Sequence, residues 1–127
     1  MRLLELFCGT KSVGRVAEQL GWEVISLDIE REFVPTHLCD IHEFDETMYP
    51  RDHFDMVWAS PPCTQFSVAK TVGERDIAGA SAIVERAREI IQYYNPAHWV
   101  IENHVGLFRE QPLLADLAPY RKSGSYC

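Results

Sequence analysis

The chain has 127 residues, a net charge of −7 and 46% hydrophobic residues. This length suits one small domain with a single core and is too short for two. No apolar run approaches the roughly 20 residues of a membrane span, and the N-terminal run is too short for a signal peptide, so we expect a cytoplasmic protein. The excess of acidic over basic residues indicates that this segment does not bind the phosphate backbone of a nucleic acid by itself.

The cysteines and histidines show neither C-x-x-C pairs nor the spacing of metal ligands. Because a cytoplasmic chain keeps its thiols reduced, we expect free cysteines and neither a disulfide scaffold nor a metal site. The cysteines are Cys8, Cys39, Cys63 and Cys127.

Apolar runs and helical periodicity alternate along the chain. The expected elements, in order, are a strand at Leu3–Phe7, a helix at Ser12–Leu20, a strand at Trp22–Leu27, a short strand or loop at His37–Ile41, a strand at Phe54–Ala59, a helix near Ile77–Tyr94 and a strand at His98–Ile101.

Each expected helix carries one apolar stripe and a stop signal. Gly21 ends the first helix and Asn95-Pro96 ends the second. The stripes are Val13, Val16, Ala17 and Leu20 in the first helix, and Ile83, Val84, Ala87, Ile90 and Ile91 in the second.

Alternating strands and helices predict a single α/β domain over residues 1–127, with a mostly parallel sheet covered by helices on both faces. Ligands of such sheets lie beyond the carboxyl ends of the strands. The unusual residues follow the expected strands directly, so we expect a ligand site there: Gly9, Asp28, Asp40, Cys63 and Glu102.

The first candidate feature is the turn from Phe7 to Gly14. Its glycines allow a sharp turn and a close backbone approach to a ligand at a helix N-terminus. Lys11 stands where a dinucleotide fingerprint has its second glycine, so that fingerprint is absent. Taken alone, a glycine pair of this kind is better explained as an ordinary tight strand-to-helix turn.

Two carboxylates extend this feature. Asp28 ends a strand about 20 residues beyond the turn, where an acid accepts hydrogen bonds from ribose hydroxyls. Asp40 either takes the exocyclic amine of an adenine or caps a turn. Each alone is as well explained as a solvated carboxylate, but with the turn they predict an adenosine pocket.

The third and fourth candidate features carry side chains that can take part in a reaction, a thiol and a carboxylate. Pro61 and Pro62 stiffen the end of a strand and fix the direction of the next side chain, so the thiol of Cys63 is positioned, whereas Cys8 and Cys39 read as small buried hydrophobes. Glu102 and Asn103 follow the strongly apolar strand Trp99–Ile101.

Together these motifs resemble the DNA cytosine-C5 methyltransferase family over nearly the whole chain. Leu6–Gly14 resembles its first motif, where the aromatic residue packs on adenine and the glycines admit the methionine part of the cofactor. Asp28-Ile29 is similar to the ribose and adenine positions, and Asp40-Ile41 to the adenine motif. Pro62-Cys63 resembles the catalytic pair, and Glu102-Asn103 the catalytic Glu-Asn.

The resemblance implies a Rossmann-like methyltransferase fold, S-adenosyl-L-methionine as cofactor, no metal, and DNA as substrate in a restriction-modification or phage setting. It implies three catalytic residues, Cys63, Glu102 and Asn103. It also implies a cofactor site made of Phe7, Gly9, Thr10, Ser12, Val13, Gly14, Asp28, Ile29, Asp40, Ile41 and Pro61.

The departures leave other functions open. Lys11, Thr64 and His104 differ from the family's usual residues, and neither the later arginine motif nor a target-recognition domain is found, so we expect a C-terminally incomplete fold. A second polypeptide or a missing C-terminal region would then supply target recognition. The alternatives are a non-catalytic cofactor-binding fragment, half of a split enzyme, a tRNA cytosine-C5 enzyme, and an N4-cytosine enzyme, which also uses Ser-Pro-Pro-x.

Overall fold

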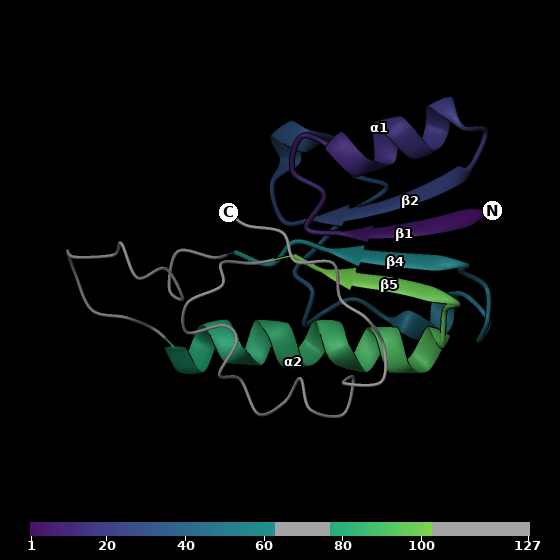
Figure 1. Cartoon of the computed structure of the whole chain (residues 1–127). Coiled ribbons are helices and arrows are strands. Elements are labelled where there is room, and N and C mark those ends of the chain that lie inside the picture. Colours follow the sequence, from purple (N-terminus) through teal and green to yellow (C-terminus); the bar gives the residue numbers. More distant parts are fainter. Residues whose placement is uncertain (63–76, 103–127) are drawn as a thin grey trace.

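The computed structural model describes residues 1–62 and 77–102 (Figure 1). Within these ranges, five parallel strands form one sheet in the order β3-β2-β1-β4-β5. The elements are β1 (Arg2–Leu6), α1 (Ser12–Gln19), β2 (Glu23–Asp28), the 3-10 turn η1 (Arg31–Phe33), β3 (His37–Leu38), the 3-10 turn η2 (Glu46–Met48), β4 (Met56–Ala59), α2 (Ile77–Tyr94) and β5 (His98–Ile101).

The strand order creates a switch point beside β1. The chain runs outward from β1 through β2 to β3, then returns to the other side of β1 for β4 and β5. In open parallel sheets, the crevice at such a reversal is where ligands bind, beyond the carboxyl ends of the strands.

The two helices lie on opposite faces of this sheet (Figure 1). On β1, Leu3 faces α1, while Leu4 and Leu6 join the core cluster beneath α2. Residues Leu3 through Leu6 are all at most 3% exposed, as expected for a central parallel strand covered on both faces. The predicted α/β architecture is therefore confirmed.

The apolar stripe of α2 packs into the core cluster beneath the sheet. Val84, Ala87 and Ile90 are fully buried and Ile91 is 3% exposed, as the periodicity predicts. Ile83 is different, because it is half-buried and lines a cavity. The helix is followed by Asn95 in the left-handed region (φ 45°) and by Pro96, which together prevent its continuation.

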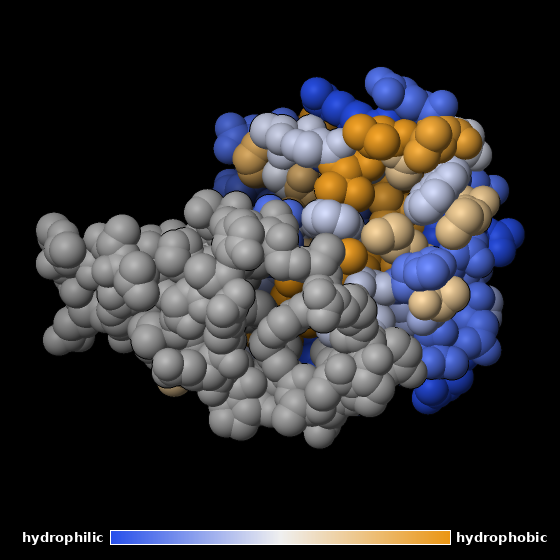
Figure 2. Space-filling view, in the orientation of Figure 1, coloured by the Kyte–Doolittle hydropathy of each residue, from blue (hydrophilic) through white to orange (hydrophobic). Residues whose placement is uncertain are grey.

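The stripe of α1 is buried only in part. Ala17 is 4% exposed, whereas Val16 and Leu20 are 55% and 67% exposed. These two side chains border an apolar groove that also contains Trp22 and Trp58, and Figure 2 shows hydrophobic residues gathered on this face. The four residues of the predicted stripe do lie along one side of α1, but among the described residues nothing covers Val16 and Leu20 there.

Across residues 1–62 and 77–102, the helices are too short or too polar to cross a lipid bilayer. The same two ranges contain no group of three or more His, Cys, Asp or Glu side chains arranged to hold a metal ion.

Candidate active site

The register of the sheet brings the functional residues into one row. Leu6 pairs with Leu27 on one side and with Ala59 on the other, and Ala59 pairs with Ile101. The next residue of each strand segment therefore falls in a line across the sheet edge: Asp28, Phe7, Ser60 and Glu102. Residues more than 70 positions apart in the sequence are neighbours here because parallel strands end at the same edge.

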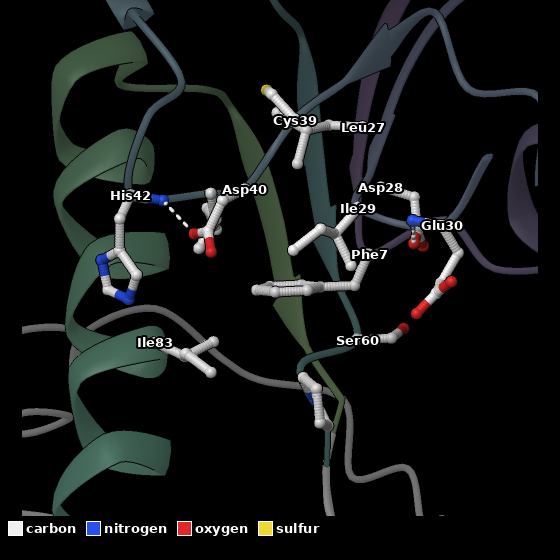
Figure 3. Close-up of a pocket in the computed structure, with 12 residues that line it drawn as sticks. Phe7, Leu27, Asp28, Ile29, Glu30, Cys39, Asp40, His42, Ser60 and Ile83 are labelled. Atoms are coloured by element: carbon white, nitrogen blue, oxygen red, sulfur yellow. Dashed lines mark hydrogen bonds between the residues drawn. The ribbon is translucent and has the colours of Figure 1, made fainter.

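The turn after β1 places an aromatic ring on the cavity. Phe7 has a φ of 57°, in the left-handed region that bulky residues avoid, and its ring lines the cavity (Figure 3). Such conformations cost about 1–3 kcal/mol and concentrate at ligand sites. Gly9 also has a positive φ (49°), so the conformation, rather than a lack of space, requires glycine there.

Asp28 is 8% exposed and organises two loops at once. Its Oδ2 accepts a hydrogen bond from the Gly9 N–H at 2.9 Å, and its Oδ1 accepts one from the Glu30 N–H at 2.9 Å. A carboxylate oxygen has two lone pairs, so each oxygen retains one for a ligand. The predicted ribose acid thus also fixes the turn after β1.

A cavity of about 330 Å³ opens beyond this row (Figure 3). Five of the predicted cofactor residues line it: Phe7, Asp28, Ile29, Asp40 and Ile41. The remaining lining residues were not predicted for this role, namely Leu27, Glu30, Cys39, His42, Ser60, Pro62 and Ile83.

Two of these additional residues had detectable signals in the sequence. Glu30 lies two residues beyond Asp28, and Ser60 follows β4 directly, where ligands of parallel sheets are expected. Cys39 was interpreted as a small buried hydrophobe, but it is half-buried and reaches the cavity. Burial, reinforced by Glu43 and Asp40, raises the pKa of its thiol.

The other predicted cofactor residues do not line this cavity. The Thr10 and Ser12 hydroxyl oxygens lie 3.2 Å apart on the exposed turn, and Gly9 reaches the cavity region through its bond to Asp28. Ser12 and Val13 border the apolar groove instead. Pro61 is buried.

Gly14 faces a buried carboxylate that sequence reasoning missed. Its N–H donates to Glu5 Oε2 at 3.1 Å, and a Cβ at this position would overlap that same oxygen. Lys11 provides no side-chain cap for α1, so Glu5 satisfies the helix N-terminus from β1. Burial raises the pKa of Glu5, although the bonds from the Gly14 and Val13 backbone oppose the shift.

Glu102 is held at the end of β5 by two contacts. Its N–H donates to the Ala59 carbonyl at 2.8 Å, and the Ser60 hydroxyl lies 3.3 Å from its Oε2. The Trp58 indole N–H donates to the same hydroxyl at 2.9 Å. Ser60 therefore connects the cavity that it lines to the carboxylate of Glu102.

Cys63 and Asn103, the other two predicted catalytic residues, lie outside the described residues. Cys63 directly follows Pro62, which lines the cavity, and Asn103 directly follows Glu102. The described part alone offers an aromatic wall, carboxylate acceptors and a further carboxylate on the adjacent strand. This arrangement suits a nucleoside beside a second, polar reactant.

Three comparisons with known proteins show what this chain is similar to. The sequence model of the family described as C-5 cytosine-specific DNA methylase matches residues 1–112. A protein of Frog virus 3 (isolate Goorha), described as a probable DNA (cytosine-5)-methyltransferase, is 36% identical over 118 residues, covering 81% of this chain and 53% of the viral protein.

The solved structure of the Entamoeba histolytica methyltransferase EhMeth superimposes with a TM-score of 0.67 at 19% identity, covering 94% of this chain and 42% of that one. This likeness supports the Rossmann-like methyltransferase fold. The chain thus spans about half the length of the viral relative. Since the family model matches most of the chain, this protein belongs to the C-5 cytosine-specific DNA methylase family.

Proposed function

We propose that the chain carries the cofactor-binding and catalytic residues of an S-adenosylmethionine-dependent DNA cytosine-C5 methyltransferase. The observation that carries the proposal is the row of Asp28, Phe7, Ser60 and Glu102 across the strand ends, with the cavity beside it. A cofactor site and a catalytic carboxylate adjoin each other there, as methyl transfer between two bound molecules requires.

The cavity fits an adenosine group by its chemistry. Phe7, Ile29 and Ile41 offer apolar surface for the purine, and Asp28 with Glu30 offers acceptors for the ribose hydroxyls. Asp40 would accept from the adenine amine. The backbone and hydroxyls of the turn through Gly9, Thr10, Ser12, Val13 and Gly14 would surround the methionine part, with Pro61 shaping the wall. When bound, S-adenosylmethionine supplies an electrophilic methyl group.

Cys63 would act as the nucleophile because C5 of cytosine is itself a poor one. A bond forms between the Cys63 sulfur and C6 of the base, which makes C5 electron-rich enough to take the methyl group. Glu102 would hydrogen-bond N3 and the 4-amino group and so stabilise the charge developing on the ring. Loss of the C5 proton then breaks the sulfur–carbon bond, while Asn103 would organise the loop.

A trapping experiment tests the nucleophile. DNA containing 5-fluorocytosine has no C5 proton to lose, so the wild-type chain should remain covalently attached to it in the presence of S-adenosylmethionine. Cys63→Ala should give no adduct, and Cys8→Ala serves as the matched cysteine control, with the adduct retained, because Cys8 is buried and does not line the cavity. An adduct that survives in Cys63→Ala would disprove the assignment.

The net charge of −7 bears on how DNA is held. Binding to a phosphate backbone depends largely on cationic side chains. We therefore propose that a further polypeptide segment supplies the surface that binds DNA and recognises the target sequence. Methylation should therefore rise strongly when a polypeptide that carries such a surface is added. Sequence-specific methylation by these 127 residues alone would contradict this part of the proposal.

The product separates the proposal from its closest rivals. Enzymes that methylate an exocyclic nitrogen usually have an aromatic residue after the two prolines, where this chain has Cys63. Mass spectrometry of digested DNA and tRNA substrates should reveal 5-methylcytosine in the DNA. N4-methylcytosine, or methylation confined to tRNA, would instead favour the corresponding rival.

A further inference from the structure

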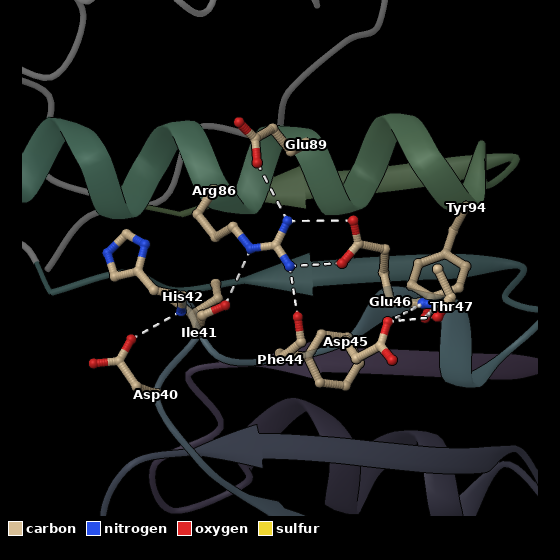
Figure 4. Close-up of polar contacts among 10 residues, drawn as sticks. All are labelled: Asp40, Ile41, His42, Phe44, Asp45, Glu46, Thr47, Arg86, Glu89 and Tyr94. Carbon is tan, nitrogen blue, oxygen red and sulfur yellow. Dashed lines mark hydrogen bonds and ion pairs between the residues drawn. The ribbon is translucent and has the colours of Figure 1, made fainter.

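Arg86, on the cavity side of the core helix α2, has no part in the proposed chemistry, yet it makes the densest set of polar contacts described in this protein. Its Nε donates to the Ile41 carbonyl at 3.2 Å, and its Nη2 donates to the Phe44 carbonyl at 2.6 Å. Nη2 also donates to Glu46 Oε2 at 2.6 Å (Figure 4). Nη1 contacts Glu46 Oε1 at 3.4 Å and Glu89 Oε2 at 3.2 Å. All three guanidinium nitrogens are therefore used.

These contacts hold a segment that lacks regular structure of its own. Between β3 and η2 the chain runs from Cys39 to Asp45 without a strand or helix. Backbone carbonyls in such a segment need partners from elsewhere, and Arg86 provides them for Ile41 and Phe44. The Tyr94 hydroxyl adds a bond of 2.6 Å to the Glu46 carbonyl, again from α2.

The segment that Arg86 holds, from Cys39 to Asp45, begins at the wall of the cavity. Asp40, Ile41 and His42 line the cavity, and Asp40 Oδ1 accepts the His42 N–H at 2.8 Å (Figure 3). In the described ranges, Asp40 Oδ2 accepts no hydrogen bond, so it is available to a ligand. The carbonyl that Arg86 binds belongs to Ile41, the residue next to Asp40.

The ion pair between Arg86 and Glu46 is partly shielded from solvent. The Arg86 side chain is 14% exposed and its partner Glu46 is 24% exposed. Arg86 lowers the pKa of Glu46, and Glu46 in turn raises the pKa of Arg86, so both stay charged at neutral pH. Lysine would keep the charge but lacks the planar set of donors that reaches two carbonyls and a carboxylate together.

We propose that Arg86 is a positioning residue that sets Asp40 and Ile41 against the purine of the bound cofactor and thereby determines its selectivity for a 6-amino purine. The inference rests on the proposed cofactor site. It adds a residue that acts through Asp40 and contacts neither cofactor nor substrate.

Calorimetric titration with two ligands tests this role. S-adenosylhomocysteine carries the 6-amino donor and an N1 acceptor, whereas S-inosylhomocysteine has a 6-oxo acceptor and a protonated N1 at the same edge of the ring. The wild-type chain should prefer the amino ligand by about tenfold or more, the value of one hydrogen bond to a charged group. In Arg86→Gln this preference should fall about tenfold, with Arg86→Lys in between.

The ratio of the two affinities distinguishes positioning from stability. A variant that is merely less stable has a smaller folded fraction, which lowers the apparent affinity for both ligands by the same factor and leaves their ratio unchanged. Glu89→Gln is the matched control, because it removes the negative charge of an Arg86 partner on α2 itself and leaves the contacts to Ile41 and Phe44. Its ratio should equal that of the wild type.

The outcomes separate the two levels of the proposal. If the wild-type chain prefers the amino ligand and the Arg86 variants keep that preference within about twofold, the inference is wrong and the cofactor site stands. If the wild-type chain binds neither ligand, the proposed cofactor site fails and the inference fails with it. Should Arg86→Gln not fold, the comparison of Arg86→Lys with Glu89→Gln decides.

Discussion

At the scale of single residues, the direction of the hydrogen bonds around Ser60 limits what Glu102 can do. An indole N–H can only donate, so the Ser60 oxygen accepts from Trp58 and its own proton is free to point to Glu102 Oε2. One oxygen of Glu102 is then oriented by the protein, and in the proposed mechanism the other would bind the base. The position of the carboxylate thus depends on a serine in the adjacent strand.

Ser60→Ala should therefore slow catalysis without lowering the affinity for the cofactor. Loss of one orienting hydrogen bond to a carboxylate is expected to reduce the rate of Cys63 adduct formation about tenfold, while affinity for S-adenosylhomocysteine changes by less than about twofold. Ser60→Thr, which keeps the hydroxyl, is the control. Equal adduct rates in Ser60→Ala and wild type would show that Ser60 does not orient Glu102.

Asp28 combines ligand binding and structure in one side chain. In Asp28→Asn, one oxygen becomes an NH₂ group, which leaves the N–H of Gly9 or Glu30 without its acceptor. We expect a loss of about 1–3 kcal/mol in unfolding free energy, measured by urea denaturation, and a fall in S-adenosylhomocysteine affinity of at least about tenfold. Glu30→Gln is the exposed control and should weaken binding alone. Unchanged stability in Asp28→Asn would contradict the double role.

At the scale of secondary-structure elements, the junction of β1 and α1 depends on a carboxylate under a helix N-terminus. Burial raises the pKa of Glu5 above that of an ordinary glutamate, so in the pH window between the two the folded state binds more protons than the unfolded state. Stability then falls as pH rises through that window and is greater below it.

Glu5→Gln should remove this part of the pH dependence. The glutamine carbonyl can still accept the Gly14 N–H, so the helix cap is kept while the titration disappears. Urea denaturation of both proteins between pH 4 and pH 8 should show that the variant gains stability relative to wild type as pH rises. A difference that is constant across this range would mean that Glu5 does not titrate differently in the two states.

In Gly14→Ala, two effects of similar size on the stability of the folded protein act in opposite directions. Alanine is favoured over glycine inside a helix by about 1 kcal/mol. Here, however, the new methyl group would overlap Glu5 Oε2 and lie 3.2 Å from Val24 Cγ1, displacing the carboxylate that caps α1. Overpacking of this kind costs about 1–3 kcal/mol, so we expect net destabilisation.

A double-mutant cycle isolates the cause. In the background of Glu5→Ala the overlapping oxygen is gone, and Gly14→Ala should become neutral or stabilising in thermal denaturation. If the substitution costs the same in both backgrounds, the contact with Glu5 is not what requires glycine at this position.

At the scale of the whole molecule, the sequence pattern predicted the helices and strands well, but it did not predict which of their faces are covered by other elements. The strand and helix ranges agree closely, and the α2 stripe of Val84, Ala87, Ile90 and Ile91 is buried, because periodicity directly reports which side of an element meets the core. In α1 the stripe also lies along one side of the helix, but Val16 and Leu20 are exposed. Periodicity gives the direction of a stripe and does not say whether another element covers it.

The candidate site was predicted where motifs follow strands and missed where contacts cross between elements. Phe7, Asp28 and Asp40 were found because each ends a strand or its adjoining turn. Glu5 was missed because a charged residue inside an apolar strand gains meaning only when α1 packs on it. Arg86 was missed for the same reason, since its partners lie about 40 residues away.

Ligand binding should stabilise the protein as a unit, because the cavity is walled by parts distant in the sequence. The turn after β1, the end of β2, the segment from Cys39 to His42 and the start of α2 all contribute to it. A ligand that binds only the folded state at 100 times its dissociation constant adds about 2.7 kcal/mol. For a domain of this size we expect S-adenosylhomocysteine to raise Tm by about 10 °C. Homocysteine alone lacks the adenosine group and should leave Tm unchanged, and Asp28→Ala should abolish the shift. A full shift in Asp28→Ala would place the cofactor elsewhere on the molecule, since this carboxylate is the point where the β1 turn, β2 and the cavity meet.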